Sequence, residues 1–159
     1  MRSAPFLLII FTSLYCQAQS VPEPSRSDCN YYVYLDSTHQ CKQKGYLIKY
    51  GYKYCDLFLF KKRDRFSEEG YQWAQDMGYC LQTKLKEFSD SLSCKQIKKQ
   101  AMRSHVNCLL DTDYLHLAKK DKRTYKLLVA HNPRNWIRGI GYLFKLNKAK
   151  HQLAVDSKR

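Results

Sequence analysis

Several features that would mark a membrane protein or a familiar type of enzyme are missing from this chain. After the first eighteen residues, no run of eighteen uncharged apolar residues occurs, so no later segment is expected to span a membrane. The chain has no Gly-x-Ser-x-Gly, no glycine-rich phosphate loop and no His-Glu-x-x-His. It has no Asn-x-Ser/Thr triplet, and therefore no acceptor for an N-linked sugar. The absence of these enzyme motifs favours a protein that is not an enzyme and that needs no metal or cofactor.

The first eighteen residues have the pattern of a secretory signal peptide. Arg2 precedes an uncharged apolar stretch from Phe6 to Phe11, and Cys16-Gln17-Ala18 is similar to an A-x-A-like cleavage site. We expect cleavage after Ala18, which leaves one secreted, extracellular domain of roughly 140 residues. A buried N-terminal helix is the disfavoured alternative, because the stretch is short and lies at the very start of the chain.

Six of the seven cysteines follow this leader, an even number, as an oxidised extracellular framework requires. They are Cys29, Cys41, Cys55, Cys80, Cys94 and Cys108. Three of the intervals between them are fourteen residues, close to four turns of an α-helix, which predicts helices joined by disulfides. Six cysteines allow fifteen pairings, and each bridge would add about 2–4 kcal/mol to the stability of such a domain.

The segment after the first cysteine is rich in tyrosine. Residues 30–54 contain seven tyrosines and two glycines and are interpreted as loop and short helix, with a strand over residues 31–35 as the alternative. The pattern turns helical from about Lys53, because Tyr54, Leu57 and Phe58 form one apolar face. We therefore expect a short first helix there, ending before the charged run at residues 61–65.

Two longer helices are predicted next, over residues 68–88 and roughly Leu92 to Leu110. Ser67 is a good N-cap for the first of them, and the two glutamates that follow it suit the positive end of the helix dipole. The Ser-Asp-Ser sequence at residues 89–91 is expected to end this helix and to cap the next.

The second of these helices limits the disulfide pairing. One face carries two cysteines together with Ile97, Ala101 and either Ser104 or His105. Cys94 and Cys108 would lie about 21 Å apart along the helix, which is too far for a bond between them. Each of them therefore needs a partner on another element.

The rest of the chain, residues 111–159, is expected to form a basic helical region that follows a disulfide-bonded core of residues 19–110. Asp111 and Asp113 are interpreted as caps of a fourth helix that ends before Asn132-Pro133. A last helix is expected over residues 136–146, with a frayed tail after about Lys148. The expected fold is a small all-α, disulfide-stapled domain of about four to five helices.

A set of residues between positions 54 and 108 has a spacing shared with a known family. They are Tyr54-Cys55-Asp56-Leu57-Phe58-Leu59, then Phe66 and Gly70, and then Cys80, Cys94 and Cys108. This pattern resembles the core of the stanniocalcin family, which are secreted, disulfide-linked helical glycoprotein hormones associated with calcium and phosphate homeostasis. The resemblance implies the pairs Cys29–Cys55, Cys41–Cys94 and Cys80–Cys108.

The chain departs from the family pattern in three respects. The cysteines before the core are sparser, the glycosylation triplet is missing, and no cysteine follows Cys108. That later cysteine is the one through which family members form disulfide-linked dimers. Neither a covalent homodimer nor an N-linked sugar is therefore expected.

Positive charge is the second strong signal. The formal net charge is +14, and the stretch from Lys119 to Lys150 contains ten Lys or Arg and a single acid, Asp121. The candidate residues for binding a polyanion are Lys119, Lys120, Lys122, Arg123 and Lys126. Outside a cell the polyanion would be heparan sulfate, an acidic lipid surface or an acidic protein; nucleic acid is not expected. The alternatives are a merely solvated helix face and proteolytic processing at the two dibasic pairs.

The favoured function is a secreted, stanniocalcin-like hormone or signalling protein that binds a cell-surface receptor or a secreted protein. The process that the resemblance suggests is calcium or phosphate homeostasis. The alternative is a basic defence or venom-type effector that acts on membranes or channels, which the charge and the 14% aromatic content favour. A small hydrolase is disfavoured, because the His-Asp-x-Cys sequence and the calcium-loop glycines of secreted phospholipases are absent. The spacing of His105 and Cys108 is better explained by a disulfide than by a metal.

Overall fold

The computed structural model describes residues 21–42, 45–130 and 148 of the chain. Within these residues the fold is all-α, as predicted, and contains no β-strand. The expected signal peptide, the last helix expected over residues 136–146 and the tail lie outside the described residues. None of the described helices is long and apolar enough to cross a membrane.

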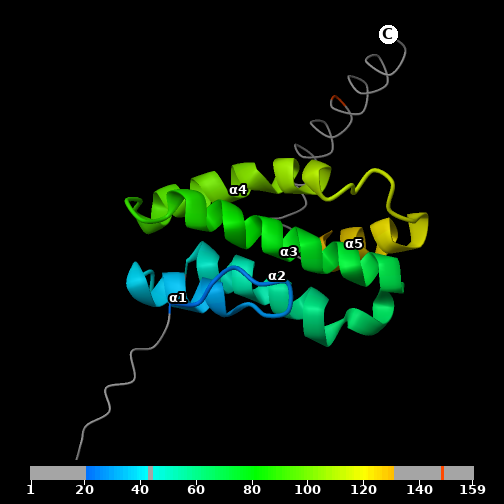
Figure 1. Ribbon diagram of the computed structural model, residues 1–159, viewed down its shortest axis with the longest axis horizontal. Helices are drawn as coiled ribbons and strands as arrows, with labels where there is room; N and C mark the ends of the chain where they lie inside the picture. Colours follow the sequence, from blue (N-terminus) through cyan, green and yellow to red (C-terminus); the bar gives the residue numbers. More distant parts are fainter. Residues whose placement is uncertain (1–20, 43–44, 131–147, 149–159) are drawn as a thin grey trace, which may run out of the picture.

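The helices form a bundle (Figure 1). After α1 (Asn30–Thr38), one helix runs through η1 (Leu47–Tyr52), α2 (Lys53–Asp56) and η2 (Leu57–Lys61), with π-helical turns in η1 and η2. A 3-10 turn, η3 (Arg63–Arg65), leads to α3 (Glu68–Phe88), α4 (Cys94–Asp111) and α5 (Lys119–Ala130). Figure 1 shows α3 and α4 side by side, with α1 and the helix over residues 47–61 below them.

Of the two interpretations of the tyrosine-rich segment, loop and short helix is correct, because residues 30–38 form α1, and the alternative of a strand over residues 31–35 is wrong. Tyr31, Tyr32 and Leu35 recur at helical spacing and are buried together. The helix packs on η1, where the ring of Tyr32 lies against Gly51. A Cβ at residue 51 would lie 2.5 Å from that ring, so the two helices can approach this closely only because the residue is glycine.

The next helix begins at about Leu47 rather than at Lys53, so the predicted start is also wrong. Tyr46 and Leu47 are buried, and the ring of Tyr46 stacks on Tyr50 one turn later. Gly51 lies inside this helix, where glycine costs about 1 kcal/mol relative to alanine. Packing against α1 offsets that cost. This packing is not visible in the local sequence pattern.

The two long helices α3 and α4 are confirmed. The hydroxyl of Ser67 accepts a hydrogen bond from the backbone N–H of Gly70 at 3.0 Å, as expected of an N-cap. Ser89 ends α3, but Ser93 rather than residues 89–91 caps α4, with its backbone N–H donating to the Gln96 side chain at 2.9 Å. Ser104 and His105 were the two candidates for the inner face of α4; His105 is buried, and Ser104 is only half-buried.

The prediction that Asp111 and Asp113 cap the fourth helix is wrong. Asp111 is the last residue of α4, and Asp113 has a left-handed backbone with φ of 57°. The N–H of Tyr114 bonds to the carbonyl of Leu109 and that of Asp113 to Leu110, both at 3.0 Å, which is the Schellman arrangement of a helix C-terminus. The chain therefore turns over residues 112–118, and α5 begins only at Lys119.

Gln82 of α3 holds the segment before α1 against α3 by hydrogen bonds. This side chain is fully buried, and its amide nitrogen donates to the carbonyls of Ser25 at 2.9 Å and Asp28 at 3.2 Å. Arg26 forms an ion pair with Asp76 at 2.6 Å. The polar atoms of Gln82 are thus satisfied by backbone, which a buried amide requires.

Two apolar clusters fill the bundle. The first lies where α1 meets the helix over residues 47–61 and includes Tyr32, Leu47 and Ile97. The second is more aromatic and includes Phe58, Trp73 and Tyr114, with Tyr125 and Leu128 of α5 packed against it. Tyr50 packs against both clusters and lies at the joint between them.

Candidate functional site

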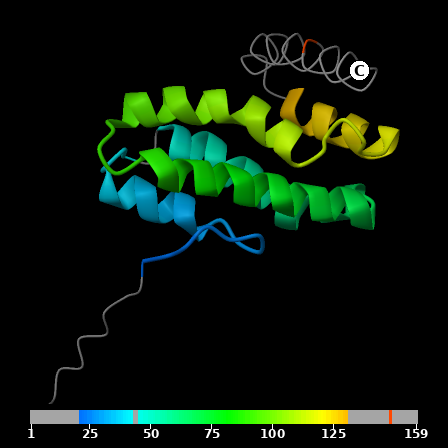
Figure 2. The same cartoon turned by 45° about the horizontal axis from the view of Figure 1, so that its top comes forward.

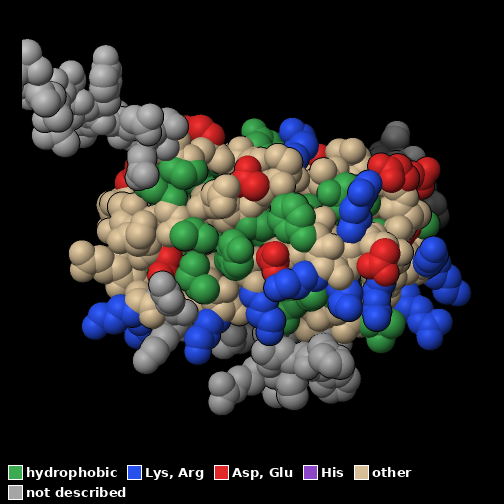
Figure 3. All heavy atoms as spheres, turned by 90° about the horizontal axis from the view of Figure 1, so that it is seen from below, with side chains coloured by type: hydrophobic (Ala, Val, Ile, Leu, Met, Phe, Trp, Pro, Cys, Tyr) green, Lys and Arg blue, Asp and Glu red, His purple; other side chains and the backbone are tan. Residues whose placement is uncertain are grey.

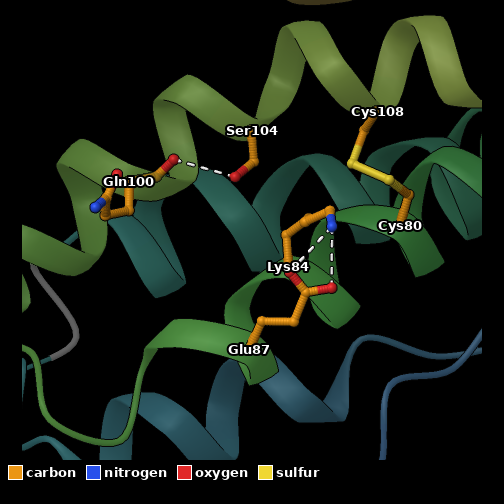
Figure 4. A network of polar contacts seen from close by, with 6 residues as sticks. All are labelled: Cys80, Lys84, Glu87, Gln100, Ser104 and Cys108. Atoms are coloured by element: carbon orange, nitrogen blue, oxygen red, sulfur yellow. Dashed lines mark hydrogen bonds and ion pairs between the residues drawn. A yellow bond between two sulfur atoms is a disulfide. The ribbon is translucent and has the colours of Figure 1, made fainter.

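All six predicted framework cysteines are bonded, in the pairs Cys29–Cys55, Cys41–Cys94 and Cys80–Cys108. These are the three pairs that the resemblance implies. Cys94 and Cys108 do have different partners, as their separation along α4 required. Figure 4 shows the Cys80–Cys108 bond reaching from α3 to α4, so Cys108 is not a metal ligand.

The three bonds join α1, α3, α4 and the helix over residues 47–61 into one covalent framework. Cys29 immediately precedes α1 and is bonded to α2, and Cys41 follows α1 and is bonded to the first residue of α4. α5 contains no cysteine and is outside this framework. Its position depends entirely on non-covalent contacts.

α5 carries all five predicted polyanion-binding residues, and four of them lie on its outer side. Lys119, Lys120, Arg123 and Lys126 are exposed. Lys122 is half-buried, and its ammonium donates to the backbone carbonyl of Leu115 at 2.7 Å. The structure thus brings four of these cations together on the solvent side and uses the fifth to fasten the preceding turn.

The single acid of this basic stretch, Asp121, points the other way. It is fully buried, and it accepts hydrogen bonds from the backbone N–H of Ser67 at 2.8 Å and from the Ser67 hydroxyl at 2.7 Å. A carboxylate at the first turn of α3 also suits the positive end of that helix. A Cβ at Gly70 would overlap this carboxylate, so the glycine leaves the space that Asp121 occupies.

Asp121 is the most important residue that the sequence patterns did not identify. Its one available signal was that it is the only acid among ten basic residues, at the start of a helix. Its partner, Ser67, is 54 residues away and was predicted to be the N-cap of α3. The cap is therefore built by two residues from different parts of the chain.

A second contact brings α5 against the basic turn that precedes α3. The hydroxyl of Thr124 donates to the carbonyl of Arg65 at 3.3 Å. Figures 1 and 2 both show α5 at the end of the bundle where α3 begins. The basic residues of α5 and those of the turn, Lys61, Lys62, Arg63 and Arg65, therefore occupy the same end of the molecule; we call these two groups together the basic end.

The cations of the basic end differ in how far they are neutralised. Lys61 pairs with Asp56 at 2.6 Å, and Arg63 approaches Glu68 at 4.0 Å while it lies over the ring of Tyr71. No ion pair between described residues involves a cation of α5. Figure 3 shows Lys and Arg side chains along one edge and at one end of the face seen from below, with apolar side chains in its middle.

His105 lies deep in the bundle rather than at a reactive surface. Its Nδ1 donates to the carbonyl of Ala101 at 2.7 Å, and its ring meets those of Tyr46 and Tyr50 edge-on. Burial lowers the pKa of His105 to about 4, so the ring is neutral at physiological pH. A cavity of about 40 Å³ beside it has room for little more than water.

The remaining histidines and acids of residues 21–42 and 45–130 do not gather into a metal site, since no three His, Cys, Asp or Glu there are arranged to hold an ion. His116 pairs with Asp113 on the surface. Comparison with known proteins finds no matching family model, no matching curated protein and no matching solved structure.

Proposed function

We propose that this chain is a secreted, stanniocalcin-like signalling protein that acts by binding a protein at the cell surface or in the extracellular fluid. The observation that carries the proposal is the disulfide framework, in which the cysteine spacing of the resemblance goes together with the connectivity that it implies. Three disulfides in a domain of this size are typical of proteins that are made in an oxidising compartment. The leader-like first eighteen residues supply the route to that compartment.

The framework suits a protein that acts through its surface. Bonds between four helices hold exposed side chains in fixed relative positions, which lowers the entropy that is lost when a partner binds. Calcium or phosphate homeostasis is the process to examine first, because the resemblance suggests it. The activity proposed here requires no bond to be made or broken in a substrate.

Export is the first test. The full chain, expressed in cells with a secretory pathway, should appear in the medium, begin close to Gln19 and contain the three disulfides. N-terminal sequencing and peptide mapping under non-reducing conditions measure this. Protein that stays in the cytosol with its first eighteen residues attached would overturn the proposal.

Receptor binding is the second test. The labelled, oxidised protein should bind to responsive cells saturably and be displaced by an excess of unlabelled protein. Reduced and alkylated protein is the matched control and should not compete, because it lacks the framework. If the protein instead releases dye from phosphatidylcholine/phosphatidylglycerol vesicles at low micromolar concentration and shows no saturable binding, the membrane-active effector is the correct function.

A further inference from the structure

We propose that the basic end of the bundle is a binding site for a sulfated glycosaminoglycan chain, built jointly from the turn at residues 61–65 and the outer side of α5. The proposal rests on the export described above, since such chains lie outside cells, but it does not depend on any receptor. It extends the site beyond α5, to basic residues that are more than fifty positions earlier in the sequence.

The two segments are held together by specific contacts. Asp121 accepts two hydrogen bonds from Ser67, and Thr124 donates to the carbonyl of Arg65. The first contact fixes the start of α5 on the start of α3, and the second fixes the next turn of α5 on η3. The positions of the cations on one segment are therefore set relative to those on the other.

The orientation of α5 leaves its positive charge uncompensated. Its only acid is fully buried, so the exposed side presents Lys119, Lys120, Arg123 and Lys126 without a carboxylate between them. Like charges on neighbouring turns of a helix repel one another, which destabilises the helix slightly. A polyanion relieves this repulsion and gains from the local positive potential.

A sulfated chain fits the basic end better than an anionic membrane does. Three exposed carboxylates, those of Asp64, Glu68 and Glu69, lie beside the turn. A continuous anionic surface would meet them together with the cations, whereas a narrow chain can follow the cations between them. Arginines, of which the basic end has three, form paired hydrogen bonds with planar or tetrahedral oxyanions. Among the large apolar residues of α5, only Leu127 is strongly exposed, which is little for a helix that inserts into lipid.

The test is binding of the purified, oxidised full chain to heparin, measured as a function of salt. The triple variant Lys119→Gln/Lys120→Gln/Arg123→Gln changes α5, and the double variant Arg63→Gln/Arg65→Gln changes the turn. The matched controls Lys95→Gln/Lys98→Gln/Lys99→Gln and Lys98→Gln/Lys99→Gln remove the same charge from exposed positions on α4. Circular dichroism and disulfide mapping establish that each variant is folded.

We expect the α5 variant to bind heparin roughly tenfold more weakly and the turn variant several-fold more weakly, while each control changes little. Each lost contact should lower the slope of log affinity against log salt by about one. Heparin from which the sulfates have been removed should bind poorly.

Four results would overturn the proposal. Equal losses in the site variants and their controls would show that only net charge matters. An unchanged turn variant would show that the site is α5 alone. Equal binding to desulfated heparin, or binding only to phosphatidylserine vesicles, would show that sulfate is not what the surface recognises. Each of these results leaves receptor binding untouched, so failure here is distinct from failure of the proposed function.

Discussion

α1 and α5 are attached to the same bundle in opposite ways. α1 is bracketed by two disulfides, Cys29–Cys55 just before it and Cys41–Cys94 just after it. α5 is attached by the carboxylate of Asp121 and by the ring of Tyr125, which packs against Phe58 and Trp73. α1 should therefore come loose only when covalent bonds are broken, whereas a single polar substitution should be enough to loosen α5.

The largest expected effect comes from removing a disulfide beside α1. Cys41→Ser/Cys94→Ser opens a loop of 53 residues and should lower the free energy of unfolding by about 4 kcal/mol. Urea unfolding followed by circular dichroism measures the loss. Hydrogen exchange should become faster in α1 and stay unchanged in α5; equal acceleration in both would show that the two attachments are not independent.

Acid should weaken both attachments together, through His105. The pKa of this histidine is lowered to about 4 in the folded protein, against about 6.5 when unfolded. The unfolded chain binds the extra proton first, so stability is complete above pH 6.5 and falls by about 3 kcal/mol as the pH approaches 4. Both α1 and α5 should loosen, because the His105 ring contacts Tyr50, which packs against both apolar clusters.

The variant His105→Gln isolates this effect from the titration of carboxylates. The difference between its urea midpoints at pH 7 and pH 4 should be much smaller than the difference for the unaltered protein. Identical pH dependence in the two proteins would mean that His105 is not the cause.

Loss of the charge on Asp121 should loosen α5 alone. Asp121→Asn leaves an amide that can accept only weaker hydrogen bonds from Ser67, and should cost about 1–3 kcal/mol. Amide exchange should rise in α5 and remain slow in α1. Asp64→Asn, at an exposed position, is the control and should change stability by less than about 0.5 kcal/mol.

The smallest expected effect concerns the turn that leads into α5. Asp113→Gly places glycine at the left-handed position after α4 and should stabilise the protein by up to about 1 kcal/mol. Loss of the surface ion pair with His116 should reduce this gain. A thermal melt measures the shift. A fall in the melting temperature would show that the contact with His116 outweighs the backbone preference.

The sequence was sufficient to predict α3 and α4, because both are long and periodic, although the cap of α4 is Ser93 rather than residues 89–91. It left a short helix and a strand both open for α1, since tyrosine and valine favour strands, whereas packing against η1 favours the helix that is observed. Gly51 belonged to a segment that was interpreted as loop and short helix, but it lies inside a helix and leaves room for the ring of Tyr32. In both cases the cause is the contact between α1 and η1, which joins residues that are far apart in the sequence.

The candidate site was predicted only in part, because it too depends on a contact between residues that are far apart in the sequence. The cations of α5 were visible as a cluster in the sequence, and the structure places four of them on the exposed side. The turn at residues 61–65 was interpreted only as a charged break between helices. What joins the two is the pair Asp121 and Ser67, which local pattern could not connect.

No bonded pair consists of cysteines that are consecutive along the chain. The three bonded loops interlock, because Cys41 lies inside the first loop and Cys80 inside the second. As the chain emerges, Cys41 meets Cys55 and then Cys80 before its own partner, Cys94, has been made. A bond with either of these has to be reopened by thiol exchange before α4 can join the bundle. Formation of the native bonds therefore depends on thiol exchange as well as on the packing of the helices.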